Sequence, residues 1–128
     1  MLPGLGASDA STVVLRGVLS GLGYRPYGWS VGRNIGPTSK IVNGMRDRLT
    51  EIRRDHGSQV SLIGWSLGGI FARQLARRAP DDVRQVITLG SPIRLERRRQ
   101  SNARRAFHLL SRWHAESLDL PLEAGLGP

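Results

Sequence analysis

The chain has 128 residues, a length that fits a single domain with one buried core. Its hydrophobic content of 39%, with 16 glycines and 7 prolines, favours a globular, turn-rich fold over a disordered chain. The absence of cysteine excludes disulfides, thiolate zinc sites and a cysteine nucleophile. The formal net charge is +9, and Lys40 is the only lysine, so arginine supplies almost all of the positive charge.

The chain carries no recognisable membrane or export signal. No apolar run approaches the roughly 18 residues that a membrane-spanning helix needs. The opening residues 1–4 have neither the charged region nor the long apolar stretch of a signal peptide. We therefore expect no membrane span and a cytoplasmic location.

The first predicted element is a helix over residues 10–22. Ser8 or Asp9 is the expected N-cap, and Gly23 the expected stop. One face of this helix is apolar and consists of Val14, Leu15, Val18 and Leu22. A short strand is expected next, from about Tyr24 to Ser30, although Pro26 inside it indicates an edge strand or a bulge.

The pattern then alternates between helical and strand-like segments. After a glycine-rich loop, the predicted elements are a helix over 38–55, a buried strand over 59–63, a helix over 67–79, a strand over 83–89 and a helix over 102–115. The helix over 38–55 has an apolar stripe of Ile41, Met45, Leu49 and Ile52. The last helix would turn Ala106, Leu110 and Trp113 inward. This alternation predicts an α/β fold in which helices flank a mostly parallel sheet.

The most informative segment is a G-x-S-x-G sequence that runs from Gly64 to Gly68, between a predicted strand and a predicted helix. In such an elbow the serine occupies a sharp turn, and the flanking glycines leave room where side chains would collide. The first turn of the following helix offers unpaired amides to a developing oxyanion. The segment therefore predicts Ser66 as a nucleophile and Leu67 N–H as an oxyanion donor. The alternative is that Ser66 is an ordinary helix N-cap.

A second oxyanion donor would come from the loop after an earlier strand, and the candidate is the opening stretch from Leu2 to Asp9. Together with the elbow, this stretch resembles the α/β-hydrolase family, especially its lipase-like and esterase-like members. Their first βα loop reads Pro-Gly-Leu-x-x-Ser-Asp, and their elbow reads Gly-Trp-Ser-Leu-Gly-Gly. The strand-end turn at residues 90–92 is similar to theirs as well. The alternative for Pro3-Gly4 is a plain turn.

The resemblance covers about residues 2–92 and leaves 93–128 as a basic helix and tail. It implies a single partial α/β-hydrolase domain over 1–128, without a cofactor, that hydrolyses a small-molecule ester or lipid through an acyl-enzyme on Ser66. It also implies that Leu5 N–H is the second oxyanion donor. Trp65 and Leu67 either line an acyl pocket or pack against neighbouring strands. The bond type, the acyl and alcohol groups and the oligomeric state are left open by the sequence.

A serine nucleophile of this fold needs a carboxylate and a histidine that follow it in the chain. Asp81 and Asp82 lie beyond the elbow helix, which is about 20 Å long, so we expect them at the opposite edge of the sheet. His56 precedes the nucleophile strand and belongs to that same edge.

The two later histidines are weak candidates for the catalytic base. His108 lies between Arg104 and Arg112 on one helical face, which favours a solvated position. His114 could act as the base, with Glu116 or Asp119, only through an unusual fold-back of the chain. We therefore expect the chain to be a fragment of a longer hydrolase, with little or no turnover of its own.

A second hypothesis treats the chain as a non-catalytic basic α/β module that binds an anionic partner. Its basis is an arginine cluster made up of Arg94, Arg97, Arg98, Arg99, Arg104, Arg105 and Arg112. No aromatic residues alternate with these arginines as a stacking platform for single-stranded nucleic acid would require, so a solvated basic face is favoured over nucleic-acid binding. Three scattered histidines form no metal-ligand set, so no metal site is expected.

Overall fold

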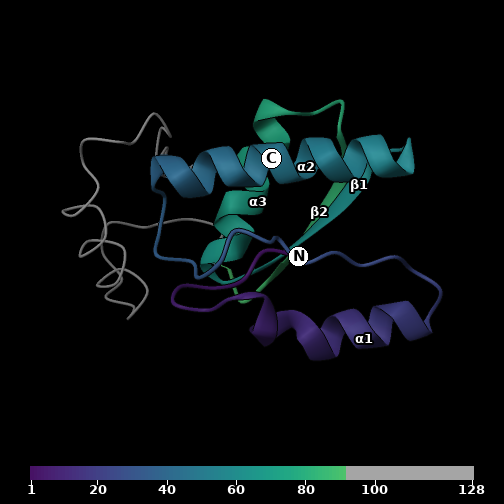
Figure 1. The fold of residues 1–128 in the computed structure, drawn as a ribbon, viewed down its shortest axis with the longest axis horizontal. Coiled ribbons are helices and arrows are strands. Elements are labelled where there is room, and N and C mark those ends of the chain that lie inside the picture. Colours follow the sequence, from purple (N-terminus) through teal and green to yellow (C-terminus); the bar gives the residue numbers. More distant parts are fainter. Residues whose placement is uncertain (92–128) are drawn as a thin grey trace.

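The computed structural model describes residues 1–91, and these form a mixed α/β fold. Its elements are a short 3₁₀ turn η1 (Asp9–Thr12) followed by α1 (Val13–Gly21), α2 (Ser39–His56), β1 (Val60–Trp65), α3 (Leu67–Arg78) and β2 (Val83–Leu89) (Figure 1). The bounds of α1, α2 and α3 lie within a few residues of those predicted from periodicity, and β2 has the predicted bounds. The helix predicted over 102–115 lies outside the described residues.

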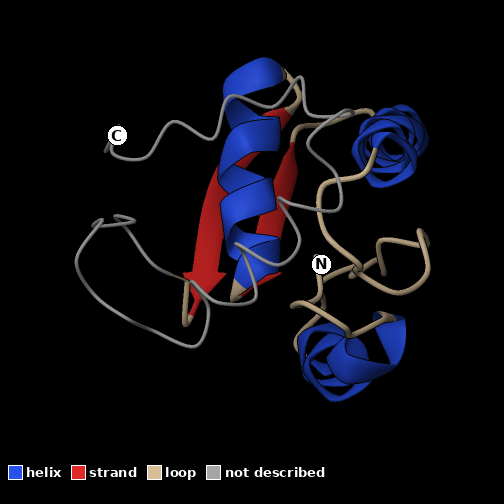
Figure 2. Ribbon diagram, turned by 90° about the vertical axis from the view of Figure 1, so that its left-hand side faces the viewer, coloured by secondary structure: helices blue, strands red, loops and turns tan. Residues whose placement is uncertain are grey.

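The described sheet consists of β1 and β2, which run parallel, with Val60 opposite Val83 and Trp65 opposite Leu89. Leu2 adds a parallel bridge to Gly64 on the other side of β1. Helix α3 covers one face of the two strands, whereas α1 and α2, seen end-on in Figure 2, lie beyond the β1 edge. The β1–α3–β2 unit is thus the parallel crossover that the alternating pattern predicts.

The core gathers around α2, α3 and β1. All four predicted stripe residues of α2 are buried, and three of them, Ile41, Met45 and Leu49, belong to a core cluster with Trp29, Leu62, Leu67, Phe71, Ala72 and Leu75. Helix α2 is well terminated, because the Thr38 side chain accepts a hydrogen bond from Ile41 N and Gly57 ends the helix with a φ of 67°. The apolar stripe and the caps therefore both specify α2, and that prediction is confirmed.

The strand predicted from Tyr24 to Ser30 is wrong, because this segment is an irregular loop. Pro26 has no N–H to give to a ladder. The N–H groups of Trp29 and Ser30 donate instead to the Asp9 carboxylate, at 2.8 and 3.0 Å. Asp9 therefore binds a distant loop, and neither it nor Ser8 forms the side-chain cap expected for the first helix.

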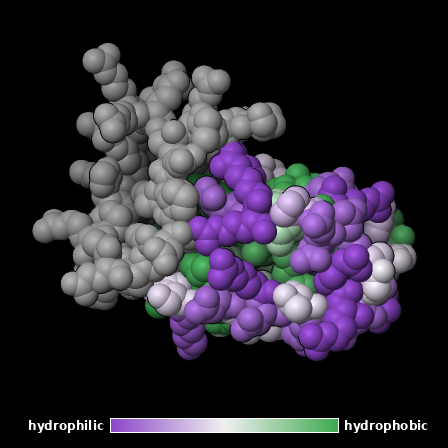
Figure 3. All heavy atoms as spheres, turned by 90° about the horizontal axis from the view of Figure 1, so that it is seen from above, coloured by the Kyte–Doolittle hydropathy of each residue, from purple (hydrophilic) through white to green (hydrophobic). Residues whose placement is uncertain are grey.

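The apolar face predicted for the first helix is present in the sequence but is not buried. None of the described residues of α1 is buried, and Val14 is 80% exposed. Elsewhere the described surface is mostly hydrophilic when seen from the direction of Figure 3. Within residues 1–91 we find no helix with the length and apolar character needed to cross a membrane.

Candidate active site

Ser66 lies at the abrupt turn where β1 ends and α3 begins. Its backbone has a φ of 52° and a ψ of −115°, and it is one of two non-glycine residues with positive φ in the described part of the chain. Such a conformation is sterically costly for a residue with a side chain and persists only where the surroundings enforce it. Ser66 occupies the N-cap position of α3, but its side chain makes no capping hydrogen bond and its backbone lacks the extended conformation of an ordinary N-cap.

Three hydrogen bonds hold the Ser66 backbone in this conformation. Its N–H donates to the carbonyl of Leu89 at the end of β2, at 2.8 Å. Its carbonyl accepts from Gly69 N at 3.0 Å and from Ser91 Oγ at 2.7 Å. Both strands and the first turn of α3 therefore fix the serine, while its hydroxyl forms no hydrogen bond within residues 1–91.

Three glycines allow the chain to approach itself this closely. A Cβ added at Gly64 would lie 2.3 Å from the Gly68 carbonyl oxygen, and one added at Gly68 would lie 2.2 Å from the Leu2 carbonyl oxygen. A Cβ at Gly69 would lie 1.9 Å from Ser91 Oγ. Each distance is far below any real contact, so the glycines of the motif are required by packing as well as by the turn.

The opening loop lies beside the serine. A Cβ built on Gly4 would lie 3.7 Å from Ser66 Cβ and 3.4 Å from the Trp65 carbonyl oxygen. Leu5, which follows Gly4, is 40% exposed, and no backbone acceptor within residues 1–91 takes up its N–H. The structure thus places Gly4, the residue before Leu5, beside Ser66, while Leu67 directly follows Ser66 in the chain.

Asn34 is a residue of this site that the sequence did not single out. Its side chain is fully buried and donates from Nδ2 to the Pro3 carbonyl at 2.9 Å, while its Oδ1 accepts from Gly36 N at 3.1 Å. Its backbone accepts from Gly6 N and donates to the Ala7 carbonyl. Asn34 therefore holds the loop that contains Leu5 through hydrogen bonds. In the sequence, the only signal for this role is its position in a glycine-rich loop.

Trp65 and Leu67, the residues on either side of the serine, have different environments. Leu67 is 7% exposed and packs in the core. Trp65 is 53% exposed and lies on the sheet face opposite α3, because the neighbouring Gly64 faces α3. Leu67 is therefore a packing residue, and Trp65 is the large apolar side chain next to the serine.

The titratable residues at the start of β1 lie far from Ser66, as expected. The Asp82 carbonyl accepts from Val60 N, and its carboxylate lies 3.6 Å from Arg53 Nε. His56 Nε2 is hydrogen-bonded to the Tyr27 hydroxyl at the end of α2. The full length of β1, about 20 Å at 3.3 Å per residue, separates these groups from the serine.

No described residue supplies a histidine base beside Ser66, because His56 is the only histidine within 1–91. His108, His114, Glu116 and Asp119 lie outside the described residues, as does the arginine cluster from Arg94 to Arg112. Within residues 1–91 no group of histidine, aspartate and glutamate side chains is arranged to hold a metal ion. Among the described residues the site therefore consists of the Ser66 hydroxyl and neighbouring backbone amides.

No protein-family model matches the chain, and no curated protein matches it either.

Proposed function

We propose that this chain is the nucleophile-bearing part of an α/β-hydrolase-type serine esterase that acts on a small-molecule ester or lipid. The observation that carries the proposal is the left-handed backbone of Ser66 at a strand-to-helix turn, with Gly64 and Gly68 packed against neighbouring backbone. Positive φ alone does not mark the elbow, because Ser30 in the loop over 24–30 has a φ of 57° as well. The strand-to-helix position and the packed glycines distinguish Ser66.

The reaction follows from the arrangement around the serine. Ser66 Oγ attacks the ester carbonyl carbon, its proton passes to a base, and the carbonyl oxygen gains negative charge. Leu67 N–H lies in the first turn of α3, whose amides and dipole favour an anion, and Leu5 N–H is the second donor. The bond between the carbonyl carbon and the alkoxy oxygen then breaks, and the leaving group takes up a proton and departs as the alcohol. Water then hydrolyses the acyl-enzyme. The base and its orienting carboxylate are not among the described residues 1–91.

The test is covalent labelling with an alkyl fluorophosphonate, read by intact-mass and peptide mass spectrometry. Ser66 Oγ would form a bond to phosphorus with loss of fluoride, and the proton would pass to solvent or to an added base. Because residues 1–91 place no base beside Ser66, added imidazole should accelerate labelling several-fold by acting as a general base. The adduct should map to Ser66 and disappear in Ser66→Ala.

Ser61→Ala is the matched control, because Ser61 is an exposed serine on the same strand and outside the turn. It should label at the rate of the unchanged chain. A folded chain that acquires no adduct at residue 66 with imidazole present, or that labels equally in Ser66→Ala, would rule out the proposal.

A further inference from the structure

The loop beside Ser66 contains a tight turn. Ala7 N donates to the Gly4 carbonyl at 3.1 Å, so Leu5 and Gly6 are the two central residues of a four-residue turn. Gly6 has a φ of 74°, which matches the third residue of a type II turn. Two residues of chain span at most about 7 Å, so Gly6 lies within this distance of Gly4, which borders Ser66.

Arg33 reaches this turn from the loop over 31–37. Its Nη1 donates to the Gly6 carbonyl at 3.2 Å. The next residue, Asn34, fixes the base of the Arg33 side chain, because its backbone accepts from Gly6 N at 2.7 Å and donates to the Ala7 carbonyl at 2.8 Å. The guanidinium is therefore held against the turn that carries the Leu5 amide, on the order of 10–15 Å from the Ser66 hydroxyl.

Most of the hydrogen-bonding capacity of Arg33 is unused. A guanidinium has five N–H donors, and the bond to Gly6 uses one of them. The side chain is exposed and forms no ion pair with a carboxylate of residues 1–91. The Asp9 carboxylate, which belongs to the same opening segment, accepts instead from Trp29 N and Ser30 N. Arg33 therefore presents a positive charge that no described carboxylate neutralises.

Two exposed apolar side chains accompany this charge. Leu5, within the turn, is 40% exposed, and Ile35, two residues after Arg33, is 49% exposed. We call Leu5, Arg33 and Ile35 the rim of the site, because all three belong to the hydrogen-bonded loops beside Ser66. A ligand that combines an apolar chain with an anionic group would cover the apolar side chains and pair with the guanidinium.

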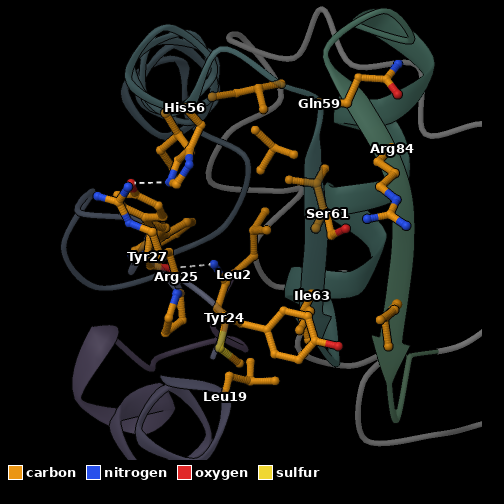
Figure 4. A pocket seen from close by; sticks show the side chains of 18 of the residues that line it. Leu2, Leu19, Tyr24, Arg25, Tyr27, His56, Gln59, Ser61, Ile63 and Arg84 are labelled. Atoms are coloured by element: carbon orange, nitrogen blue, oxygen red, sulfur yellow. Dashed lines mark hydrogen bonds between the residues drawn. The ribbon is translucent and has the colours of Figure 1, made fainter. Parts of the chain in front are cut away.

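Other exposed arginines lie on a different surface. Figure 4 shows a cavity of about 570 Å³ between β1 and the loop over 24–29, with Arg25 and Arg84 among its lining residues. Neither Ser66 nor Arg33 lines this cavity. Arg25 therefore offers a matched comparison, because it carries the same charge at an exposed position away from the rim.

We propose that Arg33 is a specificity-determining residue that binds an anionic group, a carboxylate or a phosphate, on the ester substrate. The inference rests on the proposed role of Ser66 as the nucleophile. With the ester carbonyl at Ser66, the apolar part of the substrate passes over Leu5 and Ile35, and its charged end meets the guanidinium, whose planar fork suits both anions. The substrate class is therefore an anionic amphiphilic ester.

The experiment compares alkyl fluorophosphonates that differ only at the end of the alkyl chain. Within each pair the chain length is the same, from six to twelve carbons, and the end is a carboxylate or a neutral carboxamide. Rate constants for labelling of Ser66 are measured by mass spectrometry with imidazole present. The carboxylate probe should react about threefold to fivefold faster at low salt, and this preference should shrink in 0.5 M salt. A phosphate-ended probe shows which anion Arg33 prefers.

Protein variants assign the preference to Arg33. Arg33→Ala should bring the ratio of the two rate constants close to one, whereas Arg33→Lys should retain part of the preference. Arg25→Ala removes the same charge and should leave the ratio unchanged, which separates the rim from long-range attraction by the net positive chain.

The ratio of rate constants distinguishes substrate binding from a purely structural role. If Arg33 only held the Gly6 turn, Arg33→Ala would slow both probes equally and keep the ratio, and that result would overturn the proposal. Equal reaction of the unchanged chain with the anionic and neutral probes at every chain length would overturn it as well. Absence of labelling at Ser66 by all probes would instead reject the proposed nucleophile, and this inference with it.

Discussion

Ser66 carries backbone strain at the turn between β1 and α3. A non-glycine residue in such a region of φ and ψ costs on the order of 1–3 kcal/mol. The three hydrogen bonds that the Ser66 backbone makes with Leu89, Gly69 and Ser91 contribute about 1 kcal/mol each. Together they are sufficient to offset this cost. The conformation therefore depends on close approach of β2 and α3, and that approach depends on the glycines.

Gly68→Ala should destabilise the chain strongly and reduce labelling of Ser66. The added Cβ would lie 2.2 Å from the Leu2 carbonyl oxygen, and backbone atoms cannot retreat as a flexible side chain can. Overpacking of this kind typically costs 1–3 kcal/mol, and about 3 kcal/mol or more is expected here. Urea unfolding followed by circular dichroism gives the free energy of unfolding.

Gly17→Ala is the control for that substitution. Gly17 lies within α1, and a Cβ there would meet nothing within 4 Å, so alanine should stabilise the helix by roughly 0.5–1 kcal/mol. Similar losses at both positions would mean that the elbow is not packed as described.

At the level of single residues, local spacing predicted the elbow but not what surrounds it. Gly64 and Gly68 could be assigned because the motif carries its own geometry. The contact of Gly69 with Ser91 and the clamp formed by Asn34 join residues more than 20 positions apart. No local pattern encodes such pairs, because they depend on how the completed elements meet.

Two loops form one structural element around the opening segment. The loop over residues 3–7 contributes Leu5 and lies against Ser66, and the loop over 31–37 holds it through Asn34. Since loops lack a ladder of their own, buried side-chain hydrogen bonds such as these determine their shape. The position of the Leu5 amide therefore depends on the buried side chain of Asn34.

Asn34→Ala should lower stability and slow the labelling of Ser66. It leaves the Pro3 carbonyl and Gly36 N without partners in a buried place, which costs about 1–3 kcal/mol. Asn34→Asp keeps the size but loses the donor to Pro3, and should also slow labelling. Asn43→Ala, at an exposed position of α2, is the control and should change neither quantity. Unchanged labelling in a folded Asn34→Ala chain would show that the clamp does not position the site.

The helices were more predictable than the extended segments. Four buried residues at helical spacing, a cap at Thr38 and a stop at Gly57 all agree on α2, so its prediction held. The segment over 24–30 has apolar residues suited to a strand, but its amides are bound by Asp9 from 20 residues away. Competition for backbone donors is a tertiary effect, and the strand pattern alone does not contain it.

At the scale of the whole described unit, apolar surface remains uncovered on one side. α3 covers one face of β1 and β2, while Trp65 and Ile87 on the opposite face are 53% and 42% exposed. α1 adds exposed valines on its outer side. Apolar surface of this extent usually marks a site of contact with another molecule or segment.

The buried Met1 amine gives the molecule a predictable dependence on pH. Burial, its main cause, lowers the pKa of this amine from 8.0 to about 6, with Arg16 and Arg48 adding to the shift and Asp9 opposing it. Between pH 6 and 8 the unfolded chain therefore binds more protons than the folded chain, so the free energy of unfolding rises with pH across this window. The full change is on the order of 2–3 kcal/mol, and the destabilisation is complete below pH 6.

Urea unfolding at pH 5.5 and 8.5, with and without N-terminal acetylation, isolates this contribution. Acetylation removes the titrating charge and leaves every other ionisable group, so the acetylated chain should lose the part of the pH dependence that the amine supplies. If the two chains show the same difference between the two pH values, the amine is solvated, and the hydrogen bond from Met1 to Tyr27 does not hold the first residues between β1 and the 24–29 loop. A smaller pH dependence in the acetylated chain would instead show that folding buries the amine, as its lowered pKa requires.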